Sequence, residues 1–111
     1  MTELQLSDFD IDHQLLELTG TSLVIFTSVG CSACRWARQQ LPGMGLAVDR
    51  LCWIDAQDNG GAVQRYEVFH LPALFLVRDG AFHGAIRAPL NVKGLASALD
   101  RALASPPDEL P

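Results

Sequence analysis

The sequence predicts an α/β domain in which helices cover both faces of one central, mixed β-sheet. Short apolar segments rich in β-forming residues alternate with helical segments along most of the chain, which favours parallel strands joined by crossover helices. The last two strand-like segments are instead separated by Asp79 and Gly80, a two-residue signal for an antiparallel hairpin. We therefore expect one domain at residues 1–104 and a flexible, proline-rich tail at residues 105–111.

Local signals place the elements in order. Gly20 closes the first helix, Pro42 stops the second, and Asn91 is an expected N-cap of the last. Continuous apolar runs indicate strands that are buried on both faces. The expected elements are a helix at 12–19, a strand at 22–28, a helix at 32–41, a strand at 50–55, a helix at 62–67, strands at 73–77 and 81–88, and a last helix with Leu95, Ala98, Leu99, Ala102 and Leu103 on one face.

Charge and composition exclude several classes of function. The chain has 13 acidic and 8 basic residues and a net charge of −5, so a phosphate backbone is not attracted and nucleic acid is not an expected partner. No apolar run approaches the ~20 residues that cross a bilayer, and no membrane association is expected. The opening stretch is acidic where a secretory signal is basic, so we expect a cytoplasmic protein.

Two cysteines, Cys31 and Cys34, lie where a buried strand gives way to a helix. A reducing compartment does not favour structural disulfides, so the pair is a redox site, half of a metal site, or two small residues packed in a core. A metal site needs more soft ligands than Cys52 and the scattered histidines supply, and none is expected. Cys52, in the middle of a strand, is expected to be buried and inert.

Four segments together resemble the thioredoxin family: "VIFTSVGCSAC" (24–34), "WID" (53–55), "RYEVFHLPALFLVRDG" (65–80) and the closing amphipathic helix. The resemblance spans roughly residues 9–104. It implies the thioredoxin fold, with a CxxC that opens a helix after a buried strand. It also implies that Pro72 is preceded by a cis peptide bond and lies against the cysteines.

The resemblance implies a cytosolic thiol–disulfide oxidoreductase without a bound cofactor. Cys31 would attack a disulfide of a protein substrate, and Cys34 would resolve the mixed disulfide. A helix N-terminus favours the Cys31 thiolate, because its partial positive charge and unpaired N–H groups stabilise an anion. Leu71 would hydrogen-bond the substrate chain and Pro72 would shield Cys31 from metal. A disulfide reductase is the expected electron donor.

The sequence departs from the family around the cysteines. Gly30 replaces the usual tryptophan, and Ser32 and Ala33 replace the usual Gly-Pro between the cysteines, so the reduction potential is not readable. Trp36 either replaces part of the lost aromatic surface or faces the core. Arg35 either attracts anionic substrate groups or is simply solvated.

Two more departures concern proton transfer. Ile25 stands where the family has a buried aspartate that assists proton transfer at the second cysteine, so resolution by Cys34 is expected to be slower. His70, two residues before the proline, either stabilises the Cys31 thiolate and accepts the Cys34 proton or is an exposed loop residue. The alternative function is therefore a thioredoxin-fold binding module or assembly chaperone with little redox turnover.

Overall fold

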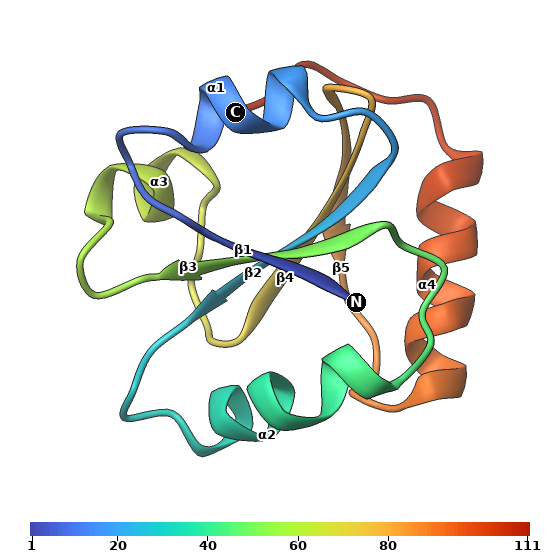
Figure 1. Cartoon of the computed structure of the whole chain (residues 1–111), viewed down its shortest axis with the longest axis horizontal. Coiled ribbons are helices and arrows are strands. Elements are labelled where there is room, and N and C mark those ends of the chain that lie inside the picture. The colour runs from blue at the N-terminus through green and yellow to red at the C-terminus, as the bar shows by residue number, and fades with distance from the viewer.

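The computed structural model describes residues 1–111 and contains one five-stranded sheet with the order β1-β3-β2-β4-β5 (Figure 1). The parallel strands are β1, β3 and β2, whereas β4 is antiparallel to β2 and β5 is antiparallel to β4. The expected mixed sheet is therefore confirmed. In chain order the elements are β1 (Thr2–Leu6), α1 (Ile11–Glu17), β2 (Thr21–Thr27), α2 (Ser32–Gln40), the 3₁₀ helix η1 (Leu41–Gly43), β3 (Arg50–Asp55), α3 (Gly60–Arg65), β4 (Ala73–Arg78), β5 (Ala81–Ile86) and α4 (Val92–Ala104).

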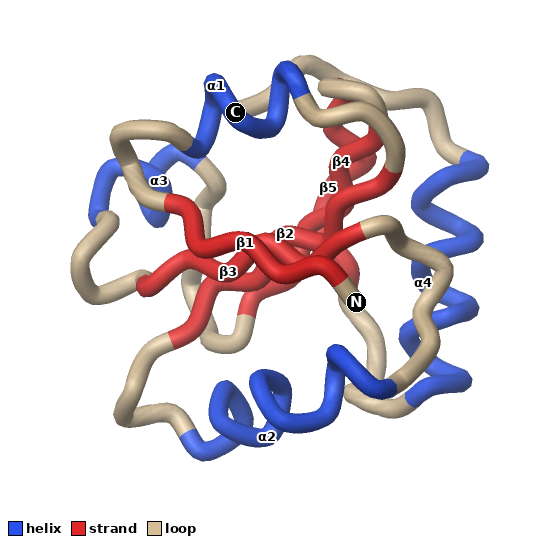
Figure 2. The backbone as a smooth tube through the Cα atoms, in the orientation of Figure 1, coloured by secondary structure: helices blue, strands red, loops and turns tan.

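Helices lie on both faces of the sheet, α1 and α3 on one and α2 and α4 on the other (Figure 2). The central strand β2 is buried on both sides. Leu23 and Ile25 pack with residues of α2 and α4, whereas Val24 and Phe26 pack with residues of α1 and α3. Because successive side chains of a strand point to opposite faces, a strand between two helical layers must be apolar throughout. This explains the continuous apolar run in the sequence.

The hairpin between β4 and β5 forms where the sequence predicted it. Asp79 and Gly80 have φ angles of 51° and 78°, the two consecutive left-handed residues that a type I′ turn requires. A Cβ atom on Gly80 would lie 2.9 Å from the backbone oxygen of Leu16, so a side chain does not fit there. The turn thus depends on glycine for its conformation and for its contact with α1.

The boundaries of the expected elements differ from the sequence prediction by up to two residues, and one strand was not expected. Strand β1 was not expected, because only Leu6 of its five residues is buried and its apolar signal is weak. Helix α2 ends at Gln40, and the chain tightens into the short 3₁₀ helix that contains Pro42. Helix α3 begins at Gly60, two residues before the expected start.

None of the helices is both long and apolar enough to span a bilayer.

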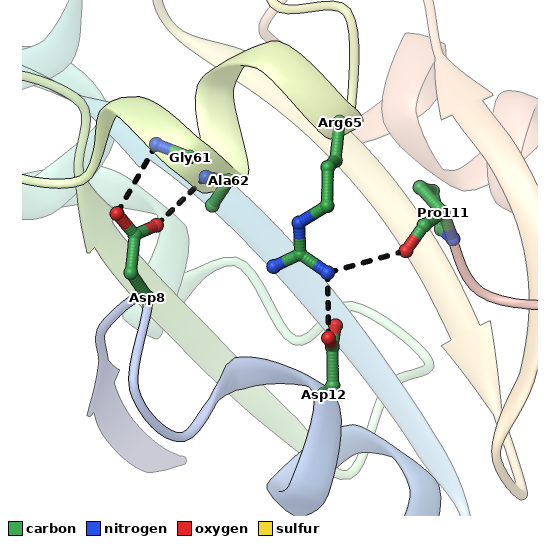
Figure 3. Close-up of polar contacts among 6 residues, drawn as sticks. All are labelled: Asp8, Asp12, Gly61, Ala62, Arg65 and Pro111. Carbon is green, nitrogen blue, oxygen red and sulfur yellow. Dashed lines mark hydrogen bonds and ion pairs between the residues drawn. The ribbon is translucent and has the colours of Figure 1, made fainter.

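The early start of α3 has a visible cause (Figure 3). The Asp8 carboxylate, from the loop after β1, accepts hydrogen bonds from the backbone N–H groups of Ala62 (2.7 Å) and Gly61 (3.1 Å). These N–H groups have no partner inside the helix, and a carboxylate also favours the positive end of the helix dipole. Asp8 therefore caps α3 from a distant part of the chain.

Replacing Asp8 with alanine is expected to destabilise the protein by about 1 kcal/mol, the usual cost of losing a helix cap. The measurement is the free energy of unfolding from urea denaturation followed by circular dichroism. Asp58, which is exposed and accepts no hydrogen bond, provides the control as Asp58→Ala. Equal losses in the two variants would contradict a capping role for Asp8.

The segment 105–111 returns along β5. Asp108 and Phe82 exchange two backbone hydrogen bonds of 2.8 Å, and Leu110 packs against the core under α1 and α3. Arg65 joins α3 to this segment, because its Nη1 donates to Asp12 of α1 at 2.5 Å and to the Pro111 oxygen at 3.4 Å (Figure 3). The structure thus gives the segment specific contacts, and its flexibility stays a prediction.

Candidate functional site

The CxxC pair lies at the N-terminus of α2, directly after the loop that follows β2. Cys31 is the N-cap residue of α2, and its Sγ accepts a hydrogen bond of 3.1 Å from the backbone N–H of Cys34. The two Cα atoms are 5.1 Å apart and the side chains form a disulfide. The first turn of α2 contains no acidic residue, so no carboxylate of the helix itself offsets the positive end of its dipole at Cys31.

The two cysteines differ in their exposure. Cys31 is half-buried, whereas Cys34 is 2% exposed. A large partner molecule can therefore reach the first sulfur but not the second. The two sulfurs therefore differ in reactivity toward a protein, since only that of the half-buried Cys31 can be reached.

The loop before β4 lies against Cys31. The Leu71–Pro72 peptide bond is cis, as the resemblance implied, and the Leu71 carbonyl oxygen is 3.7 Å from the Cys31 Sγ atom. Leu71 and Pro72 are half-buried, and His70 is exposed and makes no hydrogen bond. The structure thus brings Cys31, Cys34, Leu71 and Pro72 together, with His70 at the edge of the loop.

The neighbouring residues lie on the surface of the cysteine loop. Gly30, Ser32 and Ala33 are all exposed, and a Cβ atom on Gly30 would meet nothing within 4 Å. Arg35 is exposed too, and its Nη1 donates to the Val29 carbonyl oxygen at 3.1 Å.

Trp36, the remaining residue near the pair, is 36% exposed. Its side chain therefore reaches the surface of α2, and the alternative of a core tryptophan is wrong. The core tryptophan of this face is Trp53 of β3, which is 1% exposed.

The position of the family's buried aspartate is fully apolar. Ile25 is 0% exposed and is the register partner of Trp53 on β3. The indole Nε1 of Trp53 donates to the Glu3 carboxylate at 2.8 Å, and the Arg38 guanidinium lies 4.4 Å from the Trp53 ring centroid. No carboxylate occupies the core beside Ile25, as the sequence indicated.

Sequence reasoning missed a polar pocket beside Cys34. This pocket has a volume of about 310 Å³ and is lined by Cys34 and by Asp55, the last residue of β3. Thr27 at the end of β2 is the register partner of Asp55, so the parallel pairing of the two strands brings this carboxylate to the edge where α2 begins. The available signal was the pair of parallel strands whose carboxyl ends meet at one edge.

Cys52 is separate from the pair. It is 0% exposed in β3, and burial raises the pKa of its thiol to about 11, although a hydrogen bond with Ser22 and the charge of Arg50 act in the opposite direction. A thiol with this pKa stays protonated at neutral pH and is a poor nucleophile. No group of three or more histidine, cysteine or acidic side chains is close enough to hold a metal ion.

Comparisons with known proteins agree with this geometry at the level of the fold. No protein-family model and no curated protein matches the sequence. Among solved structures, thioredoxin from Trypanosoma brucei brucei is similar with a TM-score of 0.73 and 19% identity, over 94% of this chain and 93% of that chain. A zinc-bound form of human ERp44 is similar with a TM-score of 0.71 and 20% identity, over 88% of this chain but only 31% of the ERp44 chain. The chain therefore has the thioredoxin fold, with a CxxC pair at the start of α2 and a cis-proline beside it.

Proposed function

We propose that this protein is a thiol–disulfide oxidoreductase that reduces or exchanges disulfides of protein substrates. One observation carries the proposal: Cys31, the accessible member of a bonded cysteine pair, caps α2 while its sulfur lies 3.7 Å from the carbonyl oxygen of Leu71. A reactive sulfur thus lies beside a loop whose backbone can hold an extended chain.

The proposed reaction begins with the reduced pair. The Cys31 thiolate, stabilised by the N-terminus of α2 and by the N–H group of Cys34, attacks one sulfur of a substrate disulfide. The substrate S–S bond breaks, and the other substrate sulfur leaves with the electron pair and takes a proton. Cys34 then attacks Cys31, which releases the second substrate thiol and leaves the pair oxidised.

The surface around Cys31 supports an extended protein segment as the substrate. Leu71 and Pro72 form the wall beside the sulfur, and the open surface at Gly30 leaves space for a chain to approach. Two exposed apolar residues precede Gly30 and His70 in the sequence, Val29 at 77% exposure and Phe69 at 89% exposure. We propose that the backbone near Leu71 pairs with the substrate by strand addition.

The remaining neighbours have proposed roles as modulators. Ser32 and Ala33 would tune the reduction potential, and Arg35, Trp36 and His70 would contact the substrate. A disulfide reductase would return two electrons to the oxidised pair. We propose that the protein acts in the cytoplasm and contributes to cell redox homeostasis and electron transport, since that compartment keeps dithiols reduced.

The test is stoichiometric transfer of electrons from the reduced protein to the disulfides of insulin. Each mole of protein is expected to reduce one mole of disulfide, with mass spectrometry locating the new disulfide at Cys31 and Cys34. A Cys52→Ser variant is expected to give the same yield, because the Cys52 thiol is buried and protonated. If the reduced protein binds insulin but transfers no electrons, the protein is a binding module and the proposal is wrong.

A further inference from the structure

The resolving step of the proposed reaction requires a base, because Cys34 must lose a proton before it can attack. A thiol is mostly protonated at neutral pH, since its ordinary pKa is ~8.5. Cys34 is also 2% exposed, so bulk solvent has little access to its sulfur. The core beside it offers no base, because Ile25 and Trp53 fill the position where a carboxylate could lie.

We propose that Asp55 is the proton acceptor for Cys34, acting through water in the pocket that the two residues share. This inference rests on the proposed function and names a residue of the same site. Asp55 supplies the only carboxylate in the lining of this pocket, whose other residues are Gln5, Thr27, Ser28, Val29, Arg35 and Arg38. The volume of about 310 Å³ is large enough for several water molecules.

The hydrogen bonds around the pocket leave one oxygen of the Asp55 carboxylate free to accept a proton. One Asp55 oxygen accepts from the backbone N–H of Gln57 at 2.9 Å, and no protein donor bonds the other oxygen. The two cations in the lining donate to other residues of the pocket and form no ion pair with Asp55. Arg38 donates to Gln5 at 2.9 Å, and Arg35 donates to the Val29 carbonyl oxygen at 3.1 Å. Asp55 is therefore fixed by the end of β3 but is not neutralised by an ion pair.

His70 is placed less well for this task. It lines two other pockets, on the side of the cis-proline loop that faces β5, and it does not line the pocket beside Cys34. The charged side chains that line the pocket beside Cys34 are thus Asp55, Arg35 and Arg38. Of these three, only Asp55 can accept a proton, because arginine stays protonated in proteins.

The proposed step is balanced in atoms and electrons. The proton of the Cys34 thiol passes through water to the Asp55 carboxylate. The Cys34 sulfur then forms a bond to the Cys31 sulfur, and the bond between Cys31 and the substrate sulfur breaks. The substrate sulfur leaves with the electron pair and takes a proton, and Asp55 releases its proton to solvent.

The reduced protein and 5,5′-dithiobis(2-nitrobenzoate) test this step, because attack by Cys31 releases one thionitrobenzoate and resolution by Cys34 releases a second. At pH 7, Asp55→Asn is expected to slow the second release by about a hundredfold or more, the lower end of the usual range for general base catalysis, and to leave the first unchanged. The difference is expected to shrink as the pH rises past ~8.5, where a thiol ionises without a base.

Two further variants make the test specific. Asp55→Glu is expected to restore part of the lost rate, because it keeps a carboxylate in the pocket. Asp58→Asn is expected to leave both releases unchanged, because Asp58 is exposed and lies outside the pocket. An unchanged second release in Asp55→Asn at pH 7, or a slowing that is equal at every pH, would overturn the inference. Absence of the first release in the unmodified protein would instead overturn the proposed function.

Discussion

Replacing Cys31 with serine is expected to reduce the rate of disulfide reduction to that of the uncatalysed exchange. A serine hydroxyl does not ionise near neutral pH and cannot attack a disulfide, and Cys34 is too deeply buried to replace Cys31 as the nucleophile. Replacing Cys34 with serine is expected to have a different result. The accessible Cys31 still attacks, but the mixed disulfide is not resolved and accumulates.

Both results can be measured with one substrate. Insulin reduction in the presence of excess dithiothreitol reports turnover. In separate samples, the pre-reduced protein and insulin are mixed without dithiothreitol, and non-reducing electrophoresis after an acid quench reports the mixed disulfide. Cys52→Ser provides the matched control, because it removes the third cysteine without touching the pair. Turnover by the Cys31→Ser variant at the rate of the unmodified protein would contradict the assigned roles. Capture of substrate by Cys31→Ser instead of Cys34→Ser would reverse them.

The fold was largely predictable because its strongest signals are local. The strand β2 is buried along its whole length and carries the apolar run from Leu23 to Phe26, and Asp79 and Gly80 supply the left-handed turn of the hairpin. Strand β1 was missed for the opposite reason. It lies at the edge of the sheet and pairs only with β3, so most of its side chains are exposed and leave little periodic signal.

The start of α3 was misplaced because its cap comes from elsewhere in the chain. Asn59 is the N-cap residue, but its side chain makes no hydrogen bond to the helix, and the carboxylate of Asp8 instead accepts from the N–H groups of Gly61 and Ala62 across 53 and 54 positions of sequence. Contacts of this kind depend on how two segments meet in space. Local sequence signals cannot report them.

The residues of the candidate site also fall into two groups: those that a local sequence signal reveals, and those that depend on contacts between distant segments. Cys31 and Cys34 were recognised from their spacing, and Pro72 from the family resemblance, because each is part of a short motif. Asp55 was not recognised, since its place beside Cys34 depends on the register between β2 and β3. The sequence therefore showed that isoleucine replaces the family's buried aspartate at position 25. It did not show that a carboxylate from another strand shares a pocket with Cys34.

The largest effect on stability is expected at Trp53. This side chain is 1% exposed, and it connects three elements: its ring packs in the core under α2 and α4, its Nε1 donates to Glu3 of β1 at 2.8 Å, and Arg38 of α2 lies over its face. Trp53→Ala would remove a large apolar surface and leave the Glu3 carboxylate without its donor. The expected loss is about 3–5 kcal/mol, the usual cost of truncating a buried aromatic residue.

A second tryptophan provides the control for this prediction. Trp36→Ala removes the same side chain from a position that is 36% exposed, so the loss is expected to be below about 1 kcal/mol. The free energies of unfolding come from urea denaturation followed by circular dichroism, which does not depend on either tryptophan as a reporter. Trp53→Phe is expected to lose less than Trp53→Ala, because a phenyl ring keeps most of the packing but donates no hydrogen bond to Glu3. Equal losses for Trp53→Ala and Trp36→Ala would contradict the arrangement of this core, since only the buried tryptophan joins β1 and α2 to β3.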